Sequence, residues 1–368
     1  MTRDTPPFRA EQVGSLLRSE RLKQARAQFQ ESEITFDRLK EVEDREIETL
    51  IRRQEGSGLR AITDGEYRRS WWHFDFLWQL NGCERVVSEQ GISFSGVTSK
   101  AAGIRIDGKL DFPEDHPMLA HFEFLRTHTQ RTPKMTIPSP AMLYVRTGRE
   151  LIDQGVYPDL ENFFDDLAET YRKAVAAFYQ AGCRYLQFDD TAWAFLCSKE
   201  QRGKAQARGE NLEKLGATYA RAVNFAVAGK PPDMVITGHV CRGNFRSSWI
   251  SEGGYEPVAE LLLGGVDYDG YFLEYDSERA GGFEPLRFLP KGKKLVVLGL
   301  VTSKSGELEK PDFIKRKIEE AAKYTDLAQL CLSPQCGFAS TEEGNLLSED
   351  EQWAKLRLVV DVAREVWG

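Results

Sequence analysis

The chain has 368 residues, of which 41% are hydrophobic and 29% charged, a composition typical of a globular protein with enough apolar material for a core. Its net charge of −8 argues against binding nucleic acid through a generic basic surface. No apolar run approaches the roughly 18–20 residues needed to span a bilayer, and the start of the sequence has no apolar signal segment. Six scattered cysteines fit a reducing compartment better than a disulfide framework. We therefore expect a cytoplasmic protein that binds neither nucleic acid nor a membrane.

Short apolar runs alternate with helical patterns along most of the chain. In the helical stretches, apolar residues recur three or four positions apart. Alternating β and α elements predict a parallel sheet, and eight such units predict a closed (β/α)₈ TIM barrel, with a doubly wound open sheet as the alternative. The candidate strands are 13–17, 59–64, 134–137, 183–188, 234–241, 271–274, 295–301 and 328–332, and the candidate helices are 35–54, 159–180, 211–228, 311–324 and 349–366.

Residues 70–132 interrupt this alternation. The stretch 92–112 alternates with Gly and Asp in a way that predicts a β-hairpin, inserted at about 80–115 after the second strand. No internal repeat or low-complexity linker divides the chain, so we expect one catalytic domain over residues 1–368. Five aromatic residues precede the predicted hairpin and either line a pocket for a donor or bury the insertion: Trp71, Trp72, Phe74, Phe76 and Trp78.

A His-x-Cys pair ends the fifth candidate strand. Because side chains on a strand alternate faces, a spacing of two positions lets His239 and Cys241 converge on one point. Zinc takes Cys, His and Asp or Glu ligands in a tetrahedral arrangement, and a catalytic site keeps a position for water or substrate. The pair is therefore half of a candidate zinc site, although a buried Cys beside a strand-end His would give the same pattern.

Polar residues also follow the other candidate strands. In a (β/α)₈ barrel the active site is built at the carboxyl ends of the strands, so two Cys, one His and one Glu can meet around one metal ion. Taken singly, Glu274 could be a solvated loop acid, Cys336 a turn residue, and the Asp and Glu residues helix caps or loop acids. The strand ends carry Ser15, Asp64 with Glu66, Ser139, Asp189 with Asp190, His239 with Cys241, Glu274, Ser303 with Lys304, and Cys336.

These residues resemble the zinc ligands of the catalytic, C-terminal barrel of cobalamin-independent methionine synthases. The resemblance rests on His239-Val240-Cys241, Glu274 and the Pro-x-Cys-Gly at 334–337, and it extends over nearly the whole chain through Val13-Gly14-Ser15, Asp64-Gly65-Glu66, Ser139-Pro140 and Gln187-Phe188-Asp189-Asp190. It implies a (β/α)₈ barrel that transfers a methyl group to the sulfur of homocysteine. It also implies that His239, Cys241, Glu274 and Cys336 hold zinc, and that Ser15, Glu66 and Asp189 bind the amino-acid end of homocysteine.

The chemistry of these residue types agrees with such a role. A thiol is a poor nucleophile while it keeps its proton, and coordination to zinc removes the proton at neutral pH. The carboxylates of Glu66 and Asp189 suit an ammonium group, and Ser15 with nearby backbone N–H groups suits a carboxylate. The metal would thus activate the nucleophile rather than polarise a carbonyl.

Three departures from the family concern the methyl donor. The usual members carry a second barrel toward the amino end, whereas this chain resembles a short single-barrel member. Family members usually have a His that acts as the acid after the seventh strand, and residues 299–305 of this chain contain no His. Lys304 is nearest to that position and is therefore the candidate catalytic acid. The stretch after Ser139-Pro140 lacks the tryptophan expected to stack on a folate ring.

These departures leave three hypotheses. The first is zinc-dependent methylation of homocysteine, with methylfolate or another donor. The second is alkyl transfer to another thiol or from another donor, as in relatives that open epoxides with coenzyme M; Arg18, Arg68 and Arg69 could then bind a sulfonate, or could simply lie on the surface. The third is a structural-zinc or thiol-binding protein without turnover. A homo-oligomer and a partner protein that delivers the methyl group both remain open.

Overall fold

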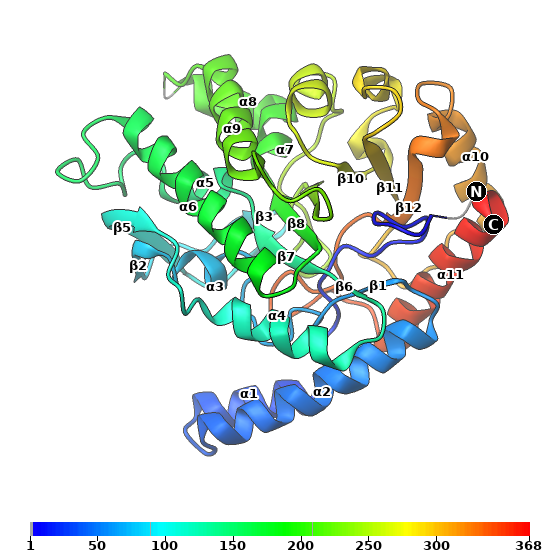
Figure 1. The fold of residues 1–368 in the computed structure, drawn as a ribbon, viewed down its shortest axis with the longest axis horizontal. Coiled ribbons are helices and arrows are strands. Elements are labelled where there is room, and N and C mark those ends of the chain that lie inside the picture. The colour runs from blue at the N-terminus through cyan, green and yellow to red at the C-terminus, as the bar shows by residue number, and fades with distance from the viewer. Residues whose placement is uncertain (1–2, 89, 208) are drawn as a thin grey trace.

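The computed structural model describes residues 3–88, 90–207 and 209–368, and its centre is a parallel sheet (Figure 1). Its six strands are hydrogen-bonded in chain order, without the reversal of strand order that a doubly wound sheet shows among its strands. Nearly every residue in them is buried, as expected for a parallel sheet covered on both faces. The strands are β7 (Met135–Pro138), β8 (Tyr185–Asp190), β9 (Val235–Val240), β10 (Gly270–Glu274), β11 (Leu295–Val301) and β12 (Leu330–Pro334).

A shorter parallel pair, β1 (Ala61–Ile62) with β6 (Thr132–Pro133), forms a separate two-stranded sheet. The segment 13–17, predicted as the first strand, is not a strand in the structure. Its backbone instead bonds to loops and side chains: Leu16 N donates to Gly65 O, and Leu17 N donates to Gln352 Oε1. Just before it, Ala10 forms an isolated parallel bridge with Leu332 of β12.

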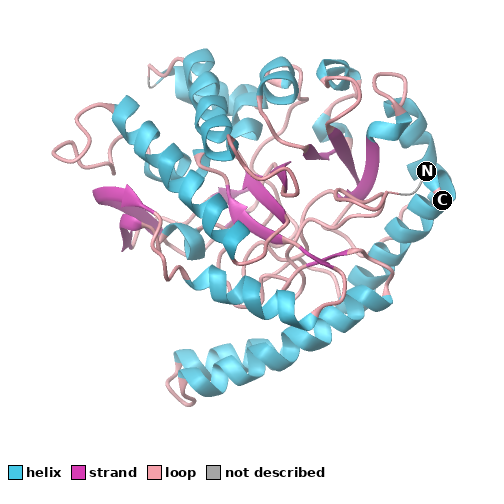
Figure 2. Cartoon of the chain, in the orientation of Figure 1, coloured by secondary structure: helices cyan, strands magenta, loops and turns pink. Residues whose placement is uncertain are grey.

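Helices lie outside the strands, as Figure 2 shows in cyan around the magenta sheet. Their apolar faces explain the placement: α6 buries Phe163, Leu167, Tyr171 and Phe178 along one side, and the Asp159 side chain caps its first turn. The longer helices are α1 (Glu20–Gln30), α2 (Phe36–Gly56), α4 (Pro117–His128), α6 (Leu160–Gln180), α8 (Lys199–Ala207), α9 (Leu212–Val227), α10 (Pro311–Ala321) and α11 (Glu349–Trp367).

Shorter helices fill the connections between strands. They are α3 (Phe74–Leu77), α5 (Ala141–Thr147), α7 (Ala192–Cys197), a π-helical turn at Glu260–Gly265, and 3₁₀ turns at Glu278–Ala280, Glu284–Phe288 and Leu327–Gln329. No helix in the described ranges is long and apolar enough to cross a membrane.

Antiparallel pairs occupy residues 81–111. Strand β2 (Asn81–Val86) pairs with β5 (Gly103–Asp111), and β3 (Ser93–Phe94) pairs with β4 (Val97–Thr98). The β3–β4 pair lies against the loop after β9, because Ser95 N donates to Trp249 O at 2.7 Å and the Phe94 and Phe245 rings stack at 5.1 Å. This region therefore packs against the loop that follows β9.

Buried His116 makes the stability of the fold depend on pH. It caps α4, with Nδ1 accepting from Met118 N at 3.2 Å, so Nδ1 carries no proton and Nε2, 3.2 Å from Phe76 O, is the donor. Burial lowers the pKa of His116 to about 4. A folded-state pKa below the unfolded value near 6.5 stabilises the fold above pH 6.5, and this stability is lost as the pH falls toward 4.

We therefore expect His116→Asn, which can cap a helix but does not titrate, to reduce the loss of unfolding free energy between pH 7 and pH 5 by about 2 kcal/mol relative to the wild type. Urea denaturation of both proteins at the two pH values measures the difference. The same loss in both proteins would contradict the assignment of the neutral tautomer.

Candidate metal and substrate site

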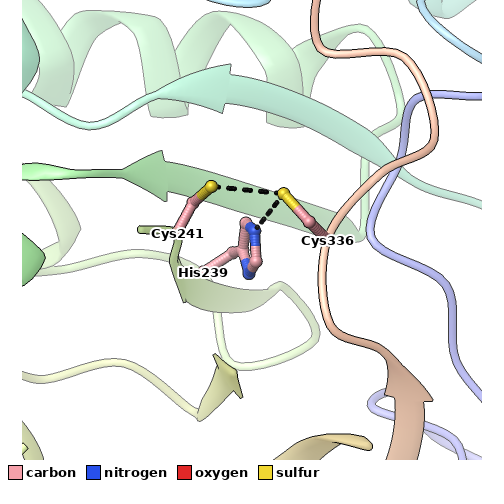
Figure 3. Close-up of side chains that lie close together, drawn as sticks. All are labelled: His239, Cys241 and Cys336. Carbon is pink, nitrogen blue, oxygen red and sulfur yellow. Dashed lines mark hydrogen bonds between the residues drawn. The ribbon is translucent and has the colours of Figure 1, made fainter. Parts of the chain in front are cut away.

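His239, Cys241 and Cys336 meet at the carboxyl ends of β9 and β12 (Figure 3). The two sulfur atoms are 3.2 Å apart, and Cys336 Sγ is 3.5 Å from His239 Nε2. Their ligand atoms all lie within 4.8 Å of one another, and all three residues are buried. His239 lies near the end of β9 and Cys241 directly follows it, so the two side chains reach the same point, as their spacing predicts.

The chemistry of this cluster fits a metal ion. Both cysteines are free thiols, and the sulfur separation is far longer than the roughly 2.05 Å of a disulfide bond. The Cys241 thiol, followed by the His239 imidazole, holds the pKa of Cys336 well below its usual range, while sharing the same proton raises the pKa of Cys241. Two sulfurs, one of them favoured as a thiolate, and one imidazole are the donor set that zinc prefers.

Glu274, the fourth predicted ligand, lies outside the group of three. It ends β10 and is fully buried, with Oε1 accepting from Arg242 N at 2.8 Å and Oε2 3.6 Å from Arg279 Nη2. Oε2 makes no hydrogen bond within the described part of the chain. Burial raises the pKa of Glu274. The carboxylate thus has one oxygen free of hydrogen bonds, and its role as a ligand remains a prediction.

A single pocket brings the predicted substrate residues to the cluster. Ser15, Glu66 and Asp189, predicted from separate strand ends, line it together with His239, Cys241 and Cys336. Asp189 lies beside His239 because β8 and β9 pair in that register. Burial raises the pKa of Asp189 to about 7 and also raises that of Glu66.

The Asp64-Gly65-Glu66 turn fixes the Glu66 carboxylate. Gly65 and Glu66 both have positive φ, near 65° and 60°, and the Asp64 Oδ1 accepts from Glu66 N at 2.9 Å. A left-handed conformation at a non-glycine residue costs roughly 1 kcal/mol and is typical of functional sites. Glu66 Oε1 accepts from Thr136 Oγ1 at 2.8 Å, so its carboxylate is held in place. Asp64 is therefore a turn residue, one of the roles that the sequence left open.

Gly337 lets the Cys336 loop approach the amino-terminal segment. A Cβ at this position would lie 2.0 Å from Ser15 Oγ, and Phe338 N donates to Ser15 O at 2.9 Å. The glycine of the Pro-x-Cys-Gly pattern is thus required for Ser15 to sit beside Cys336.

Lys304, the predicted catalytic acid, is not among the residues that line the pocket in the described ranges. Its Nζ donates to Asn244 Oδ1 at 2.9 Å and to the carbonyl oxygens of Gly243 and Ser248, each at 3.3 Å. The ammonium therefore holds the loop that follows Cys241. Its positive charge also contributes to the low pKa of Cys336, after the larger effects of Cys241 and His239.

Two asparagines join these loops, a role that no pattern in the sequence indicated. Asn244 Nδ2 donates to Gly337 O at 2.7 Å, and Asn345 Nδ2 donates to Asn244 Oδ1 at 2.9 Å and to Ser303 O at 2.8 Å. Hydrogen bonds therefore join the loops after β9, β11 and β12 around the two cysteines.

The three arginines considered for a sulfonate all have partners within the protein, and Arg69 Nη1 lies 3.6 Å from Oε1 of the pocket residue Glu66. Arg18 donates to four backbone carbonyls, including Leu16 O and Ala339 O, and Arg68 pairs with Glu43 and Asp44. Arg69 donates to Thr136 O. All three are largely buried, so their alternative placement on the surface is wrong, and none lines the pocket.

The aromatic cluster divides between the two roles considered for it. Trp71 and Trp72 line the pocket, whereas Phe74 and Phe76 are buried in the core. His73 and Arg146 also line the pocket and were missed, because a single His among aromatics and an Arg inside a helix carry no distinctive sequence signal.

Comparison with known proteins places this arrangement in a family. Residues 8–365 match the family described as "Cobalamin-independent synthase, Catalytic domain", and the chain therefore belongs to it. Two Bacillus subtilis proteins of uncharacterised function, YxjH and YxjG, are each 52% identical to this chain, over 98% and 100% of it and over 95% and 97% of their own lengths. The family expected from the motifs is confirmed, and membership supports a methyltransferase function.

Solved structures agree with this placement. A Listeria monocytogenes structure, described as a putative vitamin-B12-independent methionine synthase, superposes with a TM-score of 0.81 at 44% identity, with full coverage of both chains. A B12-independent methionine synthase from a Shewanella species, in complex with selenomethionine, shares the fold at 17% identity, with a TM-score of 0.70 and 97% coverage of both chains.

Replacing Cys336 tests the cluster directly. Because a serine hydroxyl keeps its proton where a thiol loses it, we expect Cys336→Ser to weaken zinc binding by at least about 100-fold, more than the loss of an outer-shell partner usually costs. Metal analysis after dialysis against a chelator measures the change, with Cys83→Ser as the matched control, since Cys83 lies in β2 outside the cluster. Equal zinc retention by the two variants would rule out Cys336 as a ligand.

Proposed function

We propose that this protein is a zinc-dependent methyltransferase that methylates the sulfur of homocysteine. The observation that supports this most strongly is that the His239, Cys241 and Cys336 cluster shares one pocket with Ser15, Glu66 and Asp189. A metal cluster without turnover would not need an adjoining pocket lined by two acids and a serine.

The proposal includes a closed (β/α)₈ barrel with an inserted hairpin, in one domain. The Ala10–Leu332 bridge and the bond from Leu16 N to Gly65 O support closure, because they link β12 through the amino-terminal segment to the turn after β1. Lys134 N, just before β7, donates to Ile62 O of β1 and continues the same circuit. The antiparallel β2–β5 and β3–β4 pairs support the insertion.

In this proposal His239, Cys241 and Cys336 hold zinc, and Glu274 supplies a fourth ligand through the oxygen that makes no hydrogen bond. When bound, zinc would lower the pKa of the substrate thiol so that the thiolate is available at neutral pH. Arg242 N and Arg279 contact the Glu274 carboxylate and so set its orientation.

The protein side chains orient the acceptor. Glu66 and Asp189 accept hydrogen bonds from the ammonium group of homocysteine, and Ser15 with neighbouring N–H groups binds its carboxylate. Burial raises the pKa of both acids, and a bound ammonium group would favour their charged forms. In the transfer step, the new S–CH₃ bond forms as the bond between the methyl group and its leaving group breaks. The leaving group then takes up a proton, which we assign to Lys304 or a water near it.

Product analysis tests the proposed function. The zinc-loaded protein is incubated with homocysteine and each of a panel of donors, including mono- and polyglutamylated methylfolate, and methionine is measured by mass spectrometry. We expect methionine with at least one methyl donor and none with the Cys336→Ser variant. An adduct formed only from epoxides or only on another thiol would favour alkyl transfer of a different kind, and no product with any pair would favour the structural-zinc hypothesis.

Replacing Lys304 tests the proton assignment. We expect Lys304→Ala to lower turnover by about 10²–10⁴-fold, the usual value of general acid catalysis, with zinc content unchanged. Unchanged turnover would exclude Lys304 as the acid.

A further inference from the structure

Arg146 stands apart from the other side chains of the pocket. It lies near the end of α5, the short helix that follows β7, and among the described residues it is the only Arg or Lys that lines the pocket. By contrast, Glu66 and Asp189, the pocket residues assigned to the thiol acceptor, are acidic. The pocket is therefore divided between an acidic region and a single cation.

Nothing within residues 3–88, 90–207 and 209–368 neutralises this cation. Arg146 has neither an ion pair nor a hydrogen bond there, and its Nε is buried without a partner. By contrast, Arg18, Arg68 and Arg69 all have carbonyl or carboxylate partners. Burial lowers the pKa of Arg146 to about 10, so the guanidinium remains charged at neutral pH. An unpaired guanidinium costs free energy in a partly dehydrated site unless an anion joins it.

His73 offers a second donor in the same pocket. Both of its ring nitrogens lack hydrogen-bond partners in the described part of the chain, and its ring packs on Trp72 and Phe74 with centroids 4.7 and 4.2 Å away. Burial, with a contribution from Arg146, holds the pKa of His73 well below its usual range. A neutral imidazole carries one N–H, so it can donate to an anion without adding a charge.

The position of Arg146 favours a contact with the alkyl donor rather than with the thiol acceptor. Besides this pocket, it lines one hollow beside α7 and α9 and another beside Val86 and Gly103 of the β2–β5 pair. Ile92 is also shared between the pocket and the second hollow. Arg146 therefore lies on the side of the pocket that adjoins these two hollows, neither of which is lined by Glu66 or Asp189.

We propose that Arg146, with His73, forms a subsite that binds an anionic group of the alkyl donor, a carboxylate, sulfonate or phosphate, in the pocket that Trp71 and Trp72 also line. Assigning that anion to the donor rests on the proposed function, whereas the existence of the subsite does not. A donor that is neutral or cationic around its transferable group would leave Arg146 without a counterion.

Benzoate and benzamide form a matched pair of probes, since they have nearly the same shape and differ in charge. Their binding is measured by calorimetry on the zinc-loaded protein, with and without saturating homocysteine. We expect benzoate to bind at least tenfold more tightly than benzamide. Arg146→Met should weaken benzoate about 10–100-fold, the worth of a charge-assisted hydrogen bond, and leave benzamide unchanged. Benzenesulfonate and phenylphosphonate then rank the kinds of anion.

Two further variants control for folding. Arg172→Met removes one exposed arginine of α6, which pairs with Glu169, and should leave benzoate binding unchanged. Arg146→Lys keeps a charge and should retain the preference for benzoate over benzamide, so it carries the test if Arg146→Met fails to fold.

The outcomes separate the two proposals. Equal affinity for benzoate and benzamide, or benzoate binding that is indifferent to Arg146→Met, would overturn the subsite. If homocysteine expels benzoate, Arg146 binds the acceptor's carboxylate, and the donor assignment is overturned. If the wild-type protein binds no zinc or no homocysteine, the proposed function is contradicted. Benzoate titration still tests the subsite in that case.

Discussion

The structure depends on the parallel direction of its central strands. Because β9 and β12 run the same way, their carboxyl ends lie at one edge of the sheet, and His239, Cys241 and Cys336 meet there although 97 positions separate His239 from Cys336 in the sequence. The same constraint places Asp189 of β8 in register with His239. A pocket that combines two thiols and an imidazole with carboxylates follows from strand direction, since these side chains come from segments far apart along the chain.

Because the two cysteines are buried, protein contacts rather than water must hold their loops in position. Ligand side chains in a low-dielectric site cannot rely on water, so their loops must be held by protein groups. Lys304, Asn244 and Asn345 join the loops after β9, β11 and β12, and Arg18 holds the turn of Glu66 to the segment of Ser15. Such an arrangement positions the thiols before any ligand arrives, which is the preorganisation that metal sites and acyl or alkyl transfer share.

Much of this could be predicted from the sequence, because apolar runs mark buried strands and polar residues at their ends mark the site edge. All six central strands overlap the segments that their patterns indicated, although β8 and β12 each begin and end two residues later than predicted. The five predicted helices correspond to α2, α6, α9, α10 and α11, whereas α1, α4 and α8 were not predicted. The segment 13–17 was misread, since its apolar residues face the core while its backbone bonds to Gly65 and Gln352 instead of a neighbouring strand. Arg146 and His73 could not be found, because their significance lies in missing partners, and only three-dimensional packing shows which side chains lack them.

If the protein acts as proposed, a thiol substrate joins the zinc ion that His239, Cys241 and Cys336 would hold. The most direct test is zinc-edge X-ray absorption on protein with one zinc per chain, recorded before and after homocysteine is added. We expect one additional sulfur ligand in the presence of homocysteine. A ligand sphere that is identical with and without the thiol would contradict the claim, and the cluster would then have to be regarded as structural.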